Sequence, residues 1–519
     1  MIGPALGVLL ALTALRGGAS SPTPARPASA WHEPVRAWRE THEAVIVREL
    51  TDLMGIPNVA SDRANIEKNA EKVSAVLERR GIRTELLRVA DAPPVVLGEL
   101  PAPGAKRTVI LYAHYDGQPV DPKQWTGDPW RPILRDKTLE EGGREIPWDS
   151  LPASGRMEPE WRLYGRSASD DKAPLVGWMA ALDALRSAGL RPAVNLKFFL
   201  EGEEEAGSPH LDALLEKFAD RLRGDLWLLC DGPVDQTRRM QIFFGARGVT
   251  TLELTTYGAT RRLHSGHYGN WSPNPIASLA AILTSLRDEE GMIRVPHFSD
   301  EVRPLGPEER RALADMPAVE ETLRRELNIG RTEGKGERLG EAIQRPAINF
   351  QGIRAAEVGS AATNSIPTEA TASLDFRLVP DQTPRKIQEL IEAHLKTLGY
   401  VVIHSPPDAE ARRRDAKIVK LLWGAGYPGY RTPMDLPIAR AVVAAVEEGA
   451  GGPVVKIPSL GGSIPMALFA ERLHTPIIGI PIANHDNNQH AANENLRLKN
   501  LWDGIEVYAA LFLMRLEQQ

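Results

Sequence analysis

The 519-residue sequence has only one cysteine, Cys230. A single cysteine excludes an internal disulfide and any cysteine-rich zinc site, so a metal ion would have to be held by histidine and carboxylate side chains. An excess of basic residues is also missing, because 62 Lys and Arg stand against 68 Asp and Glu, for a formal net charge of −6. Without a basic face or a Lys/Arg stripe interleaved with aromatics, we expect no nucleic-acid partner.

Apolar runs long enough to cross a bilayer are absent too, so we expect no membrane insertion. Residues 6–15 are apolar but only of signal-peptide length, and a Gly/Ser/Pro/Ala-rich segment follows them. Ala28-Ser29-Ala30 fits a small-residue cleavage site. We interpret residues 1–30 as a signal peptide or disordered leader and predict an exported, periplasmic or secreted protein. If the leader is not a signal, the protein would be cytoplasmic.

The chain also lacks a Gly-x-Ser-x-Gly elbow, which argues against a Ser-His-Asp hydrolase. Ser265 and Ser463 instead fit roles in a loop and in anion binding. A content of 42% hydrophobic and 25% charged residues is that of an ordinary globular protein. Its length is too great for one core, so we expect at least two domains.

Hydrophobic patterning changes twice along the chain. Residues 31–247 contain continuous apolar strands separated by helical patterns, which indicates a mostly parallel α/β sheet. Alternating strands and intervening helices occupy residues 248–428 and predict an inserted α+β domain with an antiparallel sheet. The α/β pattern returns in residues 429–519. The catalytic domain is therefore expected in two parts, 31–247 and 429–519.

An acidic cluster follows the apolar run at residues 196–200. Its four carboxylates are those of Glu201, Glu203, Glu204 and Glu205. Burying them at a strand end without counter-charge would be costly, so a metal ion is the favoured partner. One glutamate could then bind metal while its neighbour moves protons. A solvated acidic loop is the alternative for this segment alone.

Other candidate ligands also follow strands. His114-x-Asp116 follows an apolar strand, where the carboxylate could orient a metal-bound imidazole, although a core histidine is the alternative. Asp170-Asp171 could either cap the next helix or bridge two cations. Asp231 follows another buried strand. Because the carboxyl ends of parallel strands share one edge of a sheet, we expect these groups to meet there.

Together the motifs resemble the dinuclear-metal peptidase family M20, which includes carnosine dipeptidases, succinyl-diaminopimelate desuccinylase, acetylornithine deacetylase and aminoacylase-1. The wording of Asp170-Asp171-Lys172 and Gly461-Gly-Ser-Ile-Pro is closest to the carnosine-dipeptidase branch. The matching motifs run in order over nearly the whole chain and are His114-x-Asp116, Gly165-Arg166-x3-Asp170-Asp171-Lys172, Glu201-Gly-x-Glu204-Glu205-x-Gly-Ser208, Asp231, His264-Ser-Gly, Arg377-Leu-Val-Pro, Gly461-Gly-Ser-Ile-Pro and His490.

The resemblance implies a zinc-peptidase-like α/β/α catalytic domain interrupted by an inserted lid domain that also mediates dimerisation. It implies two Zn²⁺ per subunit, with Mn²⁺ or Co²⁺ as substitutes, and a bridging role for Asp170 beside a cis peptide to Asp171. His114 and Asp231 would complete one metal site, and Glu205 and His490 the other.

Catalytic and substrate-binding roles follow from the same resemblance. Glu204 would be the general base and acid for a hydroxide that bridges the metals, and Asp116 would orient His114. The resemblance implies that the substrate carboxylate and the oxyanion are held by His264, Asn364, Arg377 and Ser463. The histidine would reach in from the other subunit of a homodimer.

The predicted function is metal-dependent hydrolysis of an amide bond in a small substrate, by a dipeptidase or carboxypeptidase-like exopeptidase. An N-acyl amino acid amidohydrolase would use the same site and is the alternative. A catalytically silent peptide-binding relative is disfavoured, because it predicts a lost base or ligand and every one is present.

Overall fold

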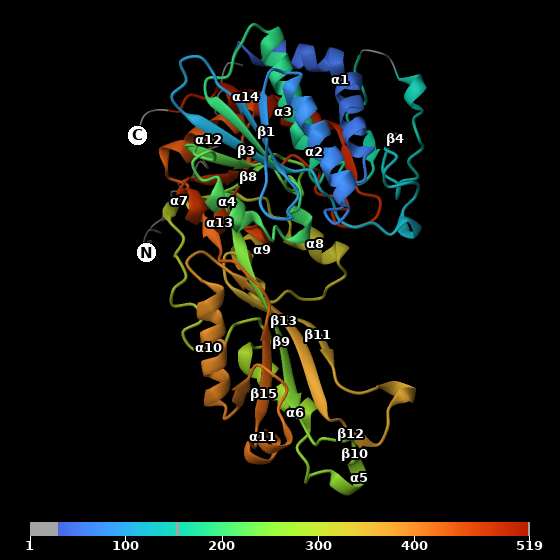
Figure 1. Ribbon diagram of the computed structural model, residues 1–519, viewed down its shortest axis with the longest axis vertical. Coiled ribbons are helices and arrows are strands. Elements are labelled where there is room, and N and C mark those ends of the chain that lie inside the picture. Colours follow the sequence, from blue (N-terminus) through green and yellow to red (C-terminus); the bar gives the residue numbers. More distant parts are fainter. Residues whose placement is uncertain (1–29, 152–154, 517–519) are drawn as a thin grey trace, which may run out of the picture.

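A computed structural model describes residues 30–151 and 155–516, so all of the predicted leader except Ala30 lies outside the described residues. The described chain forms an elongated molecule with two bodies, one built around each of two large sheets (Figure 1). Among the described residues, no helix is long and apolar enough to cross a membrane.

The first body is built on an eight-stranded sheet in the order β1-β2-β6-β3-β7-β19-β8-β17. Strands β6, β3, β7 and β19 run parallel, whereas β1 and β2 are antiparallel additions at one edge. The strands are β1 (Arg83–Leu87), β2 (Val95–Leu100), β3 (Thr108–His114), β6 (Asn195–Glu201), β7 (Leu226–Leu229), β8 (Gln241–Phe243), β17 (Val455–Ile457) and β19 (Ile477–Gly479).

Helices cover both faces of this sheet, which explains why its central strands are apolar throughout. In β3, Leu111 and Ala113 face one core while Ile110 and Tyr112 face the other. The first core includes α1 (His32–Met54), α2 (Arg63–Glu78), α3 (Lys172–Ser187), α12 (Pro437–Gly449) and α14 (Leu498–Leu513). The second includes α4 (Leu211–Lys217) and α13 (Met466–Leu473). The expected α/β/α layering is confirmed.

The second body, here called the lid, contains a seven-stranded sheet whose main path is β11-β13-β9-β15-β14. This main path is antiparallel except for the parallel edge pair of β14 and β15. Helices α6 (Pro275–Leu286) and α10 (Pro384–Thr397) pack against it. The strands of the main path are β9 (Gly245–Tyr257), β11 (Ala347–Arg354), β13 (Glu369–Leu378), β14 (Val401–Ile403) and β15 (Ile418–Trp423).

Strand β9 connects the two bodies without a break (Figure 1). Its first residues pair with β16 (Tyr430–Arg431) and β18 (Leu460–Ser463), and from Gly248 onward it pairs with β13. The predicted boundary between residues 247 and 248 therefore falls inside a continuous strand. The domain ranges themselves stay a prediction.

Smaller elements lie outside the two large sheets. A separate three-stranded sheet contains β4 (Ile133–Arg135), β5 (Arg162–Tyr164) and β20 (Asn495–Arg497). At the far tip of the lid, β10 (Leu263–His264) and β12 (Ser365–Ile366) form a ribbon beside α5 (Ser265–Tyr268) (Figure 1). The remaining helices of the described chain with α geometry are α7 (Pro307–Asp315), α8 (Glu320–Glu326), α9 (Leu339–Ile343) and α11 (Ala409–Arg414).

Candidate metal centre and active site

Three neighbouring strands bring candidate ligands to one edge of the eight-stranded sheet. His114 is the last residue of β3, Glu204 and Glu205 lie in the 3-10 turn after β6, and Asp231 follows β7. Because β6, β3 and β7 are parallel neighbours, their carboxyl ends meet at the same edge.

Asp170 reaches this edge by another route than the sequence pattern suggests. It follows β5, which belongs to the three-stranded sheet and not to the central one, and it lies just before α3. The Asp170–Asp171 peptide bond is cis, as the resemblance implies. The expectation that all the candidate ligands follow strands of one parallel sheet is therefore wrong for Asp170, whose strand pairs outside it.

Two triads of possible metal ligands share Asp170. In one, ligand atoms of His114, Asp170 and Asp231 lie within 4.8 Å of one another, and all three residues are buried. In the other, ligand atoms of Asp170, Glu205 and His490 meet the same limit. The predicted metal ligands are thus brought together in the pairing that the resemblance implies, with Asp170 common to both.

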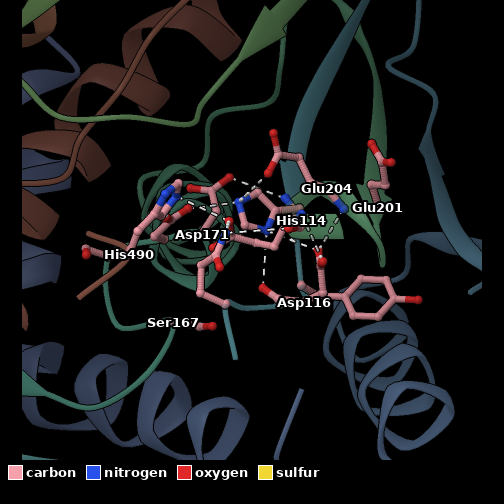
Figure 2. A network of polar contacts seen from close by, with 12 residues as sticks. His114, Asp116, Ser167, Asp171, Glu201, Glu204 and His490 are labelled. Carbon is pink, nitrogen blue, oxygen red and sulfur yellow. Dashed lines mark hydrogen bonds and ion pairs between the residues drawn. The ribbon is translucent and has the colours of Figure 1, made fainter. Parts of the chain in front are cut away.

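Short contacts connect the two triads. The Nε2 atom of His114 lies 2.9 Å from Oδ1 of Asp170, and Nε2 of His490 lies 3.2 Å from its Oδ2. His490 Nε2 is also 3.2 Å from Oε2 of Glu205. Figure 2 shows the His114 ring at the centre of this network, between Asp116 and Glu204, with His490 approaching from the opposite side.

Burial and mutual repulsion perturb the acids of the site. Burial and the neighbouring carboxylates raise the pKa of Asp231 to about 6 and that of Glu205 to about 7. Burial also raises the pKa of Glu204 well above its usual range, with added repulsion from Asp231 and Asp170. For Asp170 burial acts in the same upward direction, but contacts with His114 and His490 outweigh it and lower the pKa.

Several carboxylate oxygens at the site are buried with no hydrogen-bond partner within the described chain. They include Oδ1 of Asp231 and Oε1 of Glu205. A buried acceptor without a donor is costly, and a divalent cation would satisfy each of these atoms. This donor set of imidazole and carboxylate, with no thiolate, fits Zn²⁺.

Asp116 is buried and contacts both His114 and the turn that carries Glu204 and Glu205. Its Oδ1 lies 3.3 Å from Nδ1 of His114, which fits the orienting role implied for it. It also accepts the backbone N–H groups of Glu204 and Glu205, at 3.1 and 3.0 Å. One buried carboxylate thus positions both the first ligand and the turn that carries the proposed base.

The four glutamates at the end of β6 and in the turn after it form two pairs that contact different parts of the structure. Glu201 accepts a hydrogen bond from the Tyr112 hydroxyl at 2.8 Å, and Glu203 is bound by the backbone N–H of His210 at 3.0 Å. Glu204 and Glu205 face the ligand triads instead. A uniformly solvated acidic loop is therefore not what forms here.

Glu494 is a site residue to which the sequence analysis assigned no role. It is fully buried and accepts hydrogen bonds from the backbone N–H groups of Ser167, Ser169 and Asp170, at 2.9, 2.9 and 3.0 Å. It also pairs with Arg166 at 2.8 Å. Glu494 therefore shapes the loop that presents Asp170. In the sequence, the feature that could have pointed to Glu494 is its position four residues after His490.

The four predicted substrate-binding residues are separated into two places. Arg377 and Ser463 contact each other near the junction of the two bodies, where Nη1 of Arg377 donates to Oγ of Ser463 at 2.9 Å. His264 and Asn364 lie exposed at the tip of the lid, where Ser265 N–H donates to the Asn364 carbonyl at 2.9 Å. Within one chain the tip is far from β3, β6 and β7 (Figure 1).

Comparison with known proteins is consistent with this geometry. Residues 110–514 match the family described as peptidase family M20/M25/M40. Beta-Ala-His dipeptidase of Homo sapiens is 28% identical over 531 residues, which cover 98% of this chain and 96% of that protein. The Cys-Gly metallodipeptidase dug1 of Schizosaccharomyces pombe is 26% identical over 479 residues, covering 89% of this chain and 94% of the relative.

A solved structure shows the same fold. The M20 family metallo-carboxypeptidase Sso-CP2 from Sulfolobus solfataricus superimposes with a TM-score of 0.70 at 27% identity. The match covers 90% of this chain and 98% of the other.

Proposed function

Because the chain belongs to peptidase family M20/M25/M40, we propose that it is a metal-dependent dipeptidase-like hydrolase of small peptides. The observation that carries the proposal is the pair of ligand triads sharing Asp170, with the carboxylate of Glu204 beside them. The relatives with dipeptidase names cover most of this chain and support the substrate class.

The triads support a dinuclear site with Zn²⁺ as the preferred ion and Mn²⁺ or Co²⁺ as substitutes. His114, Asp170 and Asp231 would hold one ion, and Asp170, Glu205 and His490 the other. Bound divalent cations lower the pKa of a water molecule and polarise the substrate carbonyl.

Glu204 is positioned to move the proton. Its Oε2 lies 4.0 Å from Nε2 of His114, and its backbone is held by Asp116. Burial keeps the pKa of Glu204 high, which suits a group that accepts a proton from the attacking water and returns it to the leaving amine.

The separation of the substrate-binding residues supports a homodimer formed through the lid. His264 ends β10 and Asn364 directly precedes β12, and both strands lie at the opposite end of the molecule from β3, which ends in His114 (Figure 1). In a two-fold dimer the same tip could contribute to the site of the partner subunit, where His264 would stabilise the developing oxyanion.

The decisive experiment is hydrolysis of a mixed panel of dipeptides, tripeptides and N-acyl amino acids, followed by mass spectrometry with and without a chelator. We expect chelator-sensitive loss of dipeptides. Loss of N-acyl amino acids alone would assign the protein to the acylase alternative with the same mechanism. No turnover by metal-loaded protein would contradict the proposed function and favour a silent peptide binder.

Export is a separate proposal that depends on the sequence of the leader alone. The apolar run at residues 6–15 and the small residues before position 31 support it. Expression of the full chain in a bacterial host, followed by fractionation and N-terminal sequencing, tests it. Full-length protein retained in the cytoplasm would contradict it.

A further inference from the structure

The fold supports the two ligand triads unequally. His114 ends β3 and Asp231 directly follows β7, so neighbouring strands of the central sheet carry these two ligands of the first triad. In the second triad, Glu205 lies in a 3-10 turn and His490 in the loop between β19 and β20. The His490 side chain is 54% exposed. A ligand on an exposed loop keeps its geometry only if neighbouring groups hold it there.

A short segment after β3, residues 118–126, contacts both parts of the second triad and is here called the clasp. At its start, Nε2 of Gln118 donates to Oε2 of Glu205 at 2.7 Å. At its end, the backbone N–H of Thr126 donates to Oδ1 of Asn493 at 2.8 Å, in the loop that carries His490. Within the described part of the chain, the clasp makes no hydrogen bond or ion pair with the first triad's outer ligands, those at positions 114 and 231.

The contact of Gln118 with Glu205 suits a carboxylate that binds a cation. A glutamine amide supplies N–H donors without adding a positive charge that would compete with the metal. The amide bonds to Oε2 of Glu205, whereas Oε1 is buried and has no hydrogen-bond partner in the described chain. Asp116 accepts the backbone N–H of Glu205 at 3.0 Å. Asp116 therefore fixes the backbone of this ligand, and Gln118 fixes the orientation of its side chain.

The other end of the clasp supports the His490 loop through Arg166 as well. Arg166 is buried, and its Nη2 donates to the carbonyl of Ala491, the residue after His490, at 3.3 Å. The ring of Trp125 lies 5.1 Å from the guanidinium carbon of Arg166, within the range of a cation–π contact. Together with the contact at Asn493, this holds the loop at two points shortly after His490.

The clasp is stiff for its length. Pro119 and Pro122 restrict its backbone angles. Asp121 caps the 3-10 turn Pro122–Gln124 by accepting the N–H of Lys123 at 3.1 Å. The N–H of Trp125 closes this turn on the Pro122 carbonyl at 3.3 Å. Because the backbone between them is restricted in this way, the two ends of the clasp are held at a defined separation.

We propose that the clasp keeps Glu205 and His490 in place, so that binding of the second metal ion depends on it while binding of the first does not. Gln118 is the positioning residue for Glu205, and Trp125 and Thr126 position the loop of His490. The inference rests on the proposed dinuclear site and adds to it an order of release. When the clasp is weakened, the ion of the second triad should be lost first.

The test measures Zn²⁺ bound per chain by elemental analysis, after full-length metal-loaded protein has been equilibrated with graded concentrations of a chelator. Gln118→Met keeps the length of the side chain but removes its donor. It should weaken one of the two ions by about 10- to 100-fold and change the affinity for the other by less than about threefold. Trp125→Leu should weaken the same ion by about two- to fivefold, because the backbone contact of Thr126 remains.

A second-triad variant identifies the ion that is lost. Glu205→Gln removes a ligand of that triad, so the ion that remains is the one held by the first. Adding Gln118→Met to Glu205→Gln should then have no further effect on the affinity for that ion. A further loss would show that Gln118 also supports the first triad, which would contradict the proposal.

Gln124→Met is the matched control, because Gln124 is an exposed residue of the same segment whose Nε2 donates to Oδ2 of Asp121 at 3.3 Å and not to a candidate ligand. It should bind both ions as the wild type does. The melting temperature of each variant is measured after removal of metal. If Gln118→Met does not fold, Trp125→Leu and its combination with Glu205→Gln still decide the question.

Three outcomes would overturn the proposal while leaving the dinuclear site intact. They are wild-type affinity for both ions in Gln118→Met, equal weakening of both ions in that variant, and a Gln124→Met variant as impaired as Gln118→Met. Wild-type protein that binds a single ion, or none, would instead contradict the proposed dinuclear site itself.

Discussion

His114 at the metal centre is only 1% exposed and makes contacts on every side, whereas His264 at the tip of the lid is exposed and faces no substrate site of its own chain (Figure 1). Both belong to the motifs that suggested a peptidase. The contacts of His114 are all made within a single subunit. His264 can act on a substrate only if a second subunit brings it to a metal centre. Under the proposed dimer, one chain supplies all the candidate metal ligands, whereas catalysis would need two chains.

The largest effect is expected when the proposed base, Glu204, is removed without loss of the bound metals. Glu204→Gln should lower kcat by roughly 10³-fold or more while metal content and melting temperature stay close to wild type. Glu203→Gln is the matched control from the same acidic cluster, because Glu203 binds His210 and faces away from the ligands. Full activity in Glu204→Gln would remove Glu204 from the mechanism.

The next largest effect is expected when the lid histidine is removed. His264→Ala should reduce kcat by about 10²- to 10³-fold with both metals retained, since an oxyanion donor is lost. If His264 acts in the partner subunit, mixing inactive His264→Ala and Glu204→Gln chains should restore about a quarter of wild-type activity. Half of the dimers then contain one chain of each kind, and each such dimer has one intact site.

Recovery on mixing requires that subunits exchange, which native mass spectrometry can verify. His267→Ala is a suitable control, since His267 lies beside His264 in α5 and has no assigned role. Mixed dimers without activity would show that His264 does not act across the interface.

A third variant tests the support beneath the metal centre. Glu494→Gln replaces the carboxylate that receives three backbone N–H groups around Asp170. We expect metal affinity to fall by about 10- to 100-fold, as for other groups that hold ligands in place. Titration with Zn²⁺ measures it. Activity restored by excess metal would confirm a positioning role, and unchanged affinity would contradict it.

The smallest expected effect is a pH dependence of the metal-free protein. Glu205, with a pKa of about 7, and Asp231, at about 6, hold protons in the folded state that the unfolded chain releases near pH 4. The folded state therefore binds more protons between these values, so the free energy of unfolding falls as pH rises from about 4 to 7.

Calorimetry of chelator-treated protein should show a melting temperature that drops by a few degrees over this range. Metal-loaded protein, whose ligands are already deprotonated, should lack this drop. Parallel pH profiles for the two forms would contradict the assignment of these acids as ligands.

The sequence by itself was sufficient for the parts of the site that depend on local pattern. His114, Glu204, Glu205 and Asp231 each follow a short apolar run, and the parallel α/β pattern places the ends of such runs at one edge. The motifs also supplied Asp170 and His490 through the family resemblance. The helix at Pro275–Leu286, and the change from an α/β to an α+β pattern, could be predicted from the periodicity of hydrophobic residues in the same way.

Only the tertiary structure decided which charged groups are paired and which are free. Glu494 meets the Asp170 backbone across 324 positions, and no local pattern predicts that contact. Arg377 pairs with Asp375 two residues away, but its contact with Ser463 spans 86 positions. Periodicity is set by neighbouring residues, whereas the partner of a charge is set by which distant strands come into register, and that is known only once the chain has folded.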